Sequence, residues 1–167
     1  MNMLPPLRRF MLTVHLLASI GWTGALAGFL VLAAAGAFVS DAIVVRSAYV
    51  AMDLVTWFAI VPLALAALLT GLVQALATPW GLLRHYWVVF KLLIVCAATF
   101  MLIAKTGPIG AVAEAARTGF VDGAMMGTRL SILGHAFGGL AVLVWAAVLG
   151  MYKPAALTGY GRRKAGA

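Results

Sequence analysis

The residues of this sequence that could do chemistry are ionisable side chains inside long apolar segments. His15 lies within the apolar run 8–37, and Trp22 follows seven residues later, two turns on along the same helical face. A titratable side chain in hydrocarbon is costly and is usually functional. Because a neutral imidazole can ligate a metal or a haem iron, or carry a proton, His15 is the first candidate for chemistry.

The other polar residues of the apolar segments divide into two layers by their expected depth. The inner layer comprises His15, Gln74, His85 and Lys91, and the outer layer comprises Asp53, Thr56, Ser131 and His135. Each has a structural alternative. Lys91 can extend its ammonium to the lipid headgroups, and His85 can lie at the membrane surface. Asp53 and His135 can form a buried pair that does no chemistry.

The elements that position these residues must be membrane-spanning helices. The chain has 167 residues, 65% of them hydrophobic and 10% charged, and its mean hydropathy is +1.08. A soluble domain of this size cannot bury so much apolar surface. We expect a single all-α domain, an integral membrane antiparallel four-helix bundle, in residues 1–167. Its parts are spans at about 8–38, 45–77, 83–104 and 129–151, an external loop at 105–128, and a basic, disordered tail at 153–167.

Local features refine these spans. Asp41 is the expected N-cap of the second helix, and Pro62 is the expected site of a kink. Gly107-Pro108 opens the external loop, in which AVAEAARTGF can form a short helix on the surface. In the first span the closely spaced glycines should let another helix approach closely; they are Gly21, Gly24 and Gly28.

The basic residues predict the orientation of the bundle. One end would carry many cations and no acid, namely Arg8, Arg9, Arg84, Lys153, Arg162, Arg163 and Lys164. At the other end Asp41, Glu114 and Asp122 dilute the basic residues. The positive-inside rule therefore places the N- and C-termini in the cytoplasm. Topology and anionic headgroups then account for the net charge of +8, so membrane lipids are the expected partners and nucleic acid is not.

Haem binding and copper binding are the two cofactor chemistries to compare. Haem needs an imidazole, a slot between helices and glycines beside the macrocycle. His15 with the first-span glycines offers one side, and His135 with Gly138 and Gly139 offers another. The two histidines belong to different layers, so one porphyrin ligated by both would be tilted. Copper has less support, because the sequence has a single cysteine, Cys96, and no Met-x-x-Met or His-x-x-x-His spacing.

Several stretches resemble known membrane families. His15-x6-Trp22-x-Gly24 resembles the opening helix of HemJ-type protoporphyrinogen oxidases and CopD-type copper-resistance proteins. HYWVVFKLLIV with Lys91, IVPLALAALLTGL, and the ending Tyr152-Lys153-Pro154 are also similar to HemJ segments. WGLLRHYWVVFKL and the YGRRK tail most resemble small bacterial integral membrane proteins of unknown function, which implies the bacterial cytoplasmic (inner) membrane.

The HemJ resemblance implies that the protein binds haem b through His15 and that Lys91 is a functional partner of this histidine. The last span departs from the HemJ pattern Arg-x-x-Asn-Glu-x-Pro, because it has Arg129, Gly134 and His135 and lacks the Glu and Pro. This departure weighs against protoporphyrinogen oxidase activity.

The leading hypothesis is a haem-b-binding membrane protein, an oxidoreductase or a protein of tetrapyrrole chemistry. His15 would be an axial ligand, Lys91 would pair with a propionate or a substrate carboxylate, and Trp22 would pack on the ring. Asp53 and His135 would form a proton-linked outer site or hold a second cofactor. A second copy of the chain and a redox partner are the protein partners to consider.

Two alternatives remain open. A CopD-like protein would bind copper through His135, Asp53 and Met52. A non-catalytic scaffold would use the polar residues only to hold the bundle together. Copper titration separates the copper protein from the haem protein. A colourless protein in which His15→Ala changes stability and no spectrum would indicate the scaffold.

Overall fold

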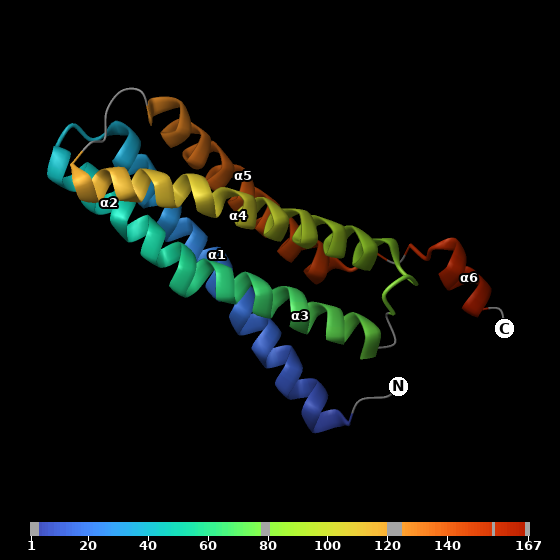
Figure 1. Ribbon diagram of the computed structural model, residues 1–167. Helices are drawn as coiled ribbons and strands as arrows, with labels where there is room; N and C mark the ends of the chain where they lie inside the picture. Colours follow the sequence, from blue (N-terminus) through green and yellow to red (C-terminus); the bar gives the residue numbers. More distant parts are fainter. Residues whose placement is uncertain (1–3, 78–80, 120–124, 155, 166–167) are drawn as a thin grey trace.

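The computed structural model (Figure 1) describes residues 4–77, 81–119, 125–154 and 156–165, which are almost entirely helical and contain no β-strand. The helices are α1 (Pro5–Phe38), α2 (Ala42–Val55), the π-helix η1 (Thr56–Ile60), α3 (Val61–Ala77), α4 (Tyr86–Thr118), α5 (Met126–Tyr152) and α6 (Gly159–Ala165). The prediction of an all-α fold is confirmed.

The long helices form an antiparallel bundle. α2, η1 and α3 make one continuous column, and successive columns run in opposite directions, so that α1 begins and α5 ends at the same end of the bundle (Figure 1). We call this the terminal end, and the opposite end, where α1 ends and α5 begins, the far end. α6 lies beside the terminal end.

Four helical columns among the described residues are long and apolar enough to cross a membrane, which indicates a multi-pass membrane protein. They contain 27 to 36 residues, which is about 40–54 Å of helix at 1.5 Å per residue and more than the ~30 Å of hydrocarbon requires. Large apolar side chains such as Phe58, Phe100, Phe137 and Trp145 are exposed on the outside of the bundle. So much exposed apolar surface is compatible with a membrane environment.

The core lies along one face of α1. Its buried side chains recur at helical spacing, at Ala18, Trp22, Leu26, Phe29 and Ala33. They belong to one cluster with apolar residues of every other long helix, including Tyr49, Met52, Ile60, Val112 and Ile132. α1 packs against the column of α2, η1 and α3 and against α5, whereas α4 packs against α2, α3 and α5 and lies diagonally opposite α1.

Two local features of the second column were predicted, the cap at Asp41 and a kink at Pro62. Asp41 caps α2 as expected, because its carboxylate accepts hydrogen bonds from the backbone of Ile43 at 2.7 Å and Val44 at 3.3 Å. Near Pro62 the helix widens into η1, which ends two residues before the proline. A π-turn is a common local adjustment where a proline disturbs the i→i−4 ladder.

The glycines of α1 do not all serve close packing. A methyl group at Gly21 would lie 3.3 Å from Leu63 of α3, so this glycine does allow a close approach. At Gly24 and Gly28 no described atom of another helix lies within 4 Å of that position, so the prediction is wrong for these two glycines within the chain.

The expected loop at 105–128 is wrong for its first half. α4 continues through Pro108 to Thr118 without a break. The continued helix buries Ile109, Val112, Ala113 and Ala116, at the i, i+3, i+4 and i+7 spacing of one helical face. Packing of this face offsets the hydrogen bond that Pro108 cannot donate. Residues 120–124 of the expected loop lie outside the described residues.

The tail is also ordered where a disordered segment was expected. Thr158 Oγ1 accepts a hydrogen bond from the backbone of Gly161 at 3.0 Å and donates one to the carbonyl oxygen of Leu83 at 2.5 Å. Leu157 forms an isolated antiparallel bridge with His85. These bonds fasten α6 to the residues before α4. Positions 155, 166 and 167 lie outside the described residues.

Candidate functional site

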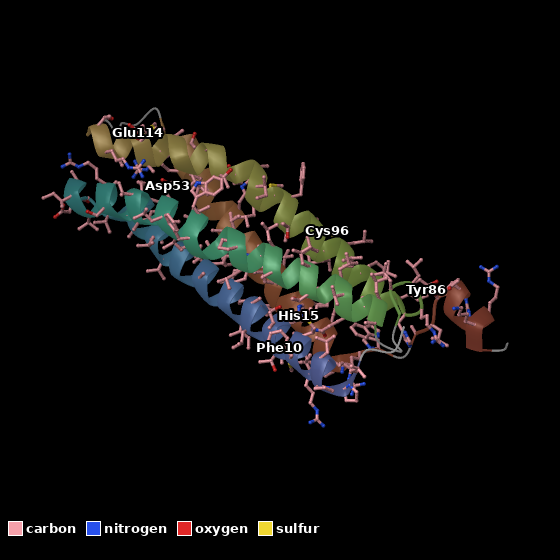
Figure 2. All side chains as sticks on the ribbon, turned by 60° about the horizontal axis from the view of Figure 1, so that its bottom comes forward. Phe10, His15, Asp53, Tyr86, Cys96 and Glu114 are labelled. Atoms are coloured by element: carbon pink, nitrogen blue, oxygen red, sulfur yellow. The ribbon has the colours of Figure 1, made fainter. Side chains whose placement is uncertain are left out.

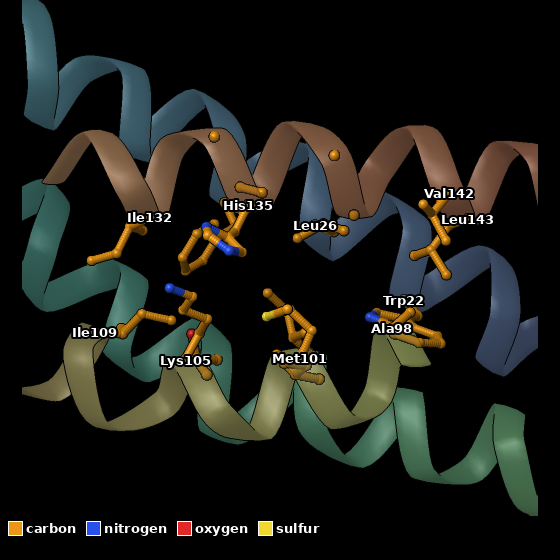
Figure 3. A pocket seen from close by; sticks show the side chains of 18 of the residues that line it. Trp22, Leu26, Ala98, Met101, Lys105, Ile109, Ile132, His135, Val142 and Leu143 are labelled. Atoms are coloured by element: carbon orange, nitrogen blue, oxygen red, sulfur yellow. The ribbon is translucent and has the colours of Figure 1, made fainter. Parts of the chain in front are cut away.

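A cavity of about 600 Å³ lies between α1, η1, α4 and α5 (Figure 3). Its floor consists of buried side chains of α1 and the α2–η1 column, namely Trp22, Leu26, Phe29, Thr56 and Ile60. Its sides are α4 and α5, and almost all of its surface is apolar. Ligand pockets in proteins have volumes of roughly 300–1,000 Å³, so the cavity has room for a large organic molecule.

The cavity is open on one side, between α4 and α5. The lining residues exposed on the molecular surface, including Ala97, Met101, His135 and Gly138, all belong to these two helices. At Gly134 and Gly138 no described atom lies within 4 Å of where a Cβ would stand. Small residues on α5 therefore keep the space between the two helices open.

One end of the cavity is polar. Lys105 Nζ donates a hydrogen bond to Ser131 Oγ at 3.2 Å, and His135 Nδ1 lies 2.6 Å from the carbonyl oxygen of Ser131. We call these three residues the polar end of the cavity (Figure 3).

The backbone bond of His135 determines its chemistry. A carbonyl oxygen can only accept, so the neutral imidazole carries its proton on Nδ1 and keeps a lone pair on Nε2. No described residue hydrogen-bonds that Nε2. A histidine held in this way has the tautomer and the fixed ring orientation of a metal ligand.

His15 lies elsewhere, between α1 and α3. Its Nδ1 is 3.1 Å from both the carbonyl oxygen of Ala67 and Thr70 Oγ1. Its ring lies over Gly71, where a methyl group would be 3.0 Å from His15 Cε1. One turn away, Gln74 Nε2 donates to the carbonyl oxygen of Met11 at 3.0 Å. His15 and Gln74 therefore join α1 to α3, and neither lines the cavity.

The expected inner layer is brought together in part. Lys91 lies within electrostatic range of His15, and its ammonium lies against Gly150 of α5, where a methyl group would be only 2.7 Å from Nζ. His85 lies at the terminal end as the N-cap residue of α4. Lys91 and His85 are likewise absent from the cavity lining.

Asp53 does not pair with His135. Its carboxylate forms an ion pair with Arg117 at 2.9 Å, and Arg117 also contacts Glu114 at 3.3 Å. The cause is the length of α4, which brings Arg117 beside α2. Figure 2 shows Asp53 and Glu114 toward one end of the bundle and His15 toward the other.

The copper hypothesis gains no cluster of ligands from this arrangement. Met52 is fully buried in the core, and Asp53 is held by Arg117. Cys96 is exposed as a free thiol. Among the described residues, no three His, Cys, Asp or Glu side chains lie together.

Lys105 is the functional candidate that the sequence reasoning missed, because it was assigned to the external loop. The available signal was the apolar periodicity of residues 109–116, which continues the helix. Among the predicted residues, the structure does bring Trp22, Ser131, His135, Gly138 and Gly139 to one cavity.

No protein-family model, curated protein or solved structure matches this chain. The resemblance carried by His15, Trp22 and Lys91 therefore stays an expectation.

Proposed function

We propose that the protein is a haem-b-binding membrane protein with a redox or tetrapyrrole-related role, and that the cavity is the haem site. The observation that carries the proposal is His135, an imidazole with Nδ1 bonded to the backbone, at one end of an apolar space of about 600 Å³. An oriented histidine beside an apolar slot is the minimum that haem ligation requires.

The residues present fit haem. His135 would hold the iron, and Trp22 on the floor would pack against the porphyrin. Gly134 and Gly138 leave room beside the ring, because no described side chain fills the space next to them. Haem would supply one-electron chemistry at its iron, while the protein holds it, orients it and surrounds it with apolar side chains.

This proposal assigns the iron to His135 instead of His15. The bonds of His15 to Ala67 and Thr70 support a structural role in joining α1 to α3. Lys91 is too far from this cavity to line it, so we do not assign it a propionate of this haem.

We further propose that both termini face the cytoplasm of a bacterial cell, across its cytoplasmic membrane. Charge asymmetry supports this orientation, because Arg84 and Lys153 lie toward the terminal end, whereas Asp41, Asp53 and Glu114 lie toward the far end. The polar end of the cavity then lies in the outer half. An alkaline phosphatase fusion at the C-terminus should be inactive, and an active fusion would reverse the orientation.

The test of haem binding is the visible spectrum of the purified protein, oxidised and then reduced with dithionite, before and after addition of haemin. We expect a Soret band and sharp reduced α-bands that disappear in His135→Ala and remain in His15→Ala. Loss of the bands in His15→Ala alone would return the ligand to His15. A protein that takes up no added haemin would refute the proposal and favour the scaffold.

A further inference from the structure

The ammonium of Lys105 lies at the polar end of the cavity without a carboxylate partner among the described residues. Its hydrogen bond goes to the neutral hydroxyl of Ser131 at 3.2 Å. The described carboxylates are engaged elsewhere, since Asp41 caps α2, and Asp53 and Glu114 contact Arg117. A half-buried charge beside apolar side chains is stabilised only when an opposite charge or several acceptors surround it.

Within the part of the chain that the structure describes, the surroundings of Lys105 offer no anion. Toward the cavity it faces the apolar side chains of Met101, Ile109 and Ile132 and the ring of His135 (Figure 3). Thr56, on the floor, uses its hydroxyl to donate to the carbonyl oxygen of Met52 at 2.8 Å. The ion that complements Lys105 therefore has to arrive with the occupant of the cavity.

The dimensions and the charge together define the occupant. Its body must be apolar, because Trp22, Leu26, Phe29 and their neighbours line nearly all of the space. It must also carry an acidic group at one edge, which the polar end would receive. Porphyrins of the haem b type have this form, an apolar macrocycle with two carboxylates on one edge.

We propose that Lys105 binds a carboxylate of a tetrapyrrole held in the cavity, and that this contact selects the free acid over a neutral analogue. The inference rests on the proposed function and deepens it, since it concerns the acidic edge of the ligand and not its iron. Ser131 orients the ammonium through the hydrogen bond described above.

The experiment uses iron-free porphyrins, so that it does not depend on ligation by His135. Protoporphyrin IX and its dimethyl ester are titrated into the purified full-length protein, and binding is followed by porphyrin fluorescence. A charge-assisted hydrogen bond contributes enough free energy to raise the affinity for the diacid above that for the diester by about tenfold to a hundredfold. Lys105→Met should abolish this preference by weakening the binding of the diacid alone, and Lys105→Arg should retain the preference.

Lys91→Met is the matched control, because it removes another lysine of the same helix that does not line the cavity. It should leave the preference for the diacid unchanged. Helical content by circular dichroism and a single peak in gel filtration establish that each variant is folded. If Lys105→Met does not fold, Lys105→Gln replaces it with a polar side chain of similar length.

Equal affinity of the unmodified protein for the diacid and the diester would overturn the inference. An equal loss of affinity for both porphyrins in Lys105→Met would also overturn it. A haem spectrum that depends on His135 would still leave the proposed function standing. Conversely, diacid preference without a haem spectrum would support Lys105 and refute iron ligation. Displacement of the diacid by oleic acid but not by oleyl alcohol would identify a lipid acid as the occupant, and the tetrapyrrole assignment would fall.

Discussion

Arg129 donates a hydrogen bond to the carbonyl oxygen of Gly36, which joins the start of α5 to the last turn of α1. The carbonyl groups in the last turn of a helix lack intrahelical partners and carry partial negative charge, so a guanidinium is well suited to them. Arg129 Nε also donates to the hydroxyl of Tyr49 at 2.9 Å, and the side chain of Tyr49 is buried. Gly36, Tyr49 and Arg129 thus fasten three helices together at the far end.

Gly36→Ala should destabilise this cluster. The added methyl group would lie 2.6 Å from Tyr49 Cζ, which is too close, so the buried ring or the backbone around it would have to shift. We expect a loss of about 1–3 kcal/mol in the free energy of unfolding, measured by thermal unfolding in detergent. Gly24→Ala is the control, because no described atom lies within 4 Å of the new group. Equal melting temperatures for the two variants would contradict the proposed packing.

His15→Ala should lower stability without removing any haem band. The variant loses the hydrogen bond from Nδ1 to the α3 backbone. We expect this loss to lower the free energy of unfolding by about 1 kcal/mol. His135→Ala is the converse case, since its imidazole is exposed and its bonds go to Ser131 of its own helix. It should change the spectrum and hardly change the melting temperature. Reversal of these two patterns would assign the ligand role to His15.

Gly138→Leu should block the cavity and leave the fold intact. The new side chain would extend into space where no described atom lies within 4 Å of its Cβ. We expect porphyrin affinity to fall by at least about tenfold, equivalent to ~1.4 kcal/mol, in the same fluorescence titration. Gly28→Leu has an equally open environment and lies outside the cavity lining, so it should bind normally. Unchanged affinity in Gly138→Leu would place the ligand elsewhere.

Thr158→Ala should loosen α6 from the bundle. The substitution removes the hydroxyl that bonds Leu83 and the backbone of Gly161. Loss of a helix cap costs about 1 kcal/mol, which raises the population of the open segment about fivefold. Trypsin should therefore cut faster after Arg162 and Arg163. Thr118→Ala, whose hydroxyl bonds only carbonyl groups of its own helix, should not accelerate that cleavage.

The sequence was sufficient for the fold class because apolar length and turn chemistry are local properties. The four apolar columns and the cap at Asp41 both follow from them. The continuation of α4 was missed because Gly107-Pro108 is a strong local break signal, and packing of Ile109 and Val112 overrides it. Since that override depends on neighbouring helices, the chain alone does not reveal it.

The site was harder to predict than the fold because a helix facing lipid is apolar on its outer side as well as toward the core. Periodicity then does not reveal which face is inside. Expected depth alone grouped His15 with Lys91, and the short spacing of His15 and Trp22 suggested one site. In the structure His15 lies between α1 and α3, whereas Trp22 lies on the floor of the cavity.

The opening of the cavity between α4 and α5 would determine the route by which the proposed ligand arrives. The exposed residues around the opening belong to helices that are long and apolar enough to cross a membrane, so in the proposed membrane protein the entrance would face the acyl chains of the bilayer. An apolar ligand would partition into that phase before it meets the protein, and exchange would proceed by lateral diffusion in two dimensions. Occupancy would then follow the mole fraction of ligand in the membrane, and the lipid would act as the reservoir from which the protein is loaded.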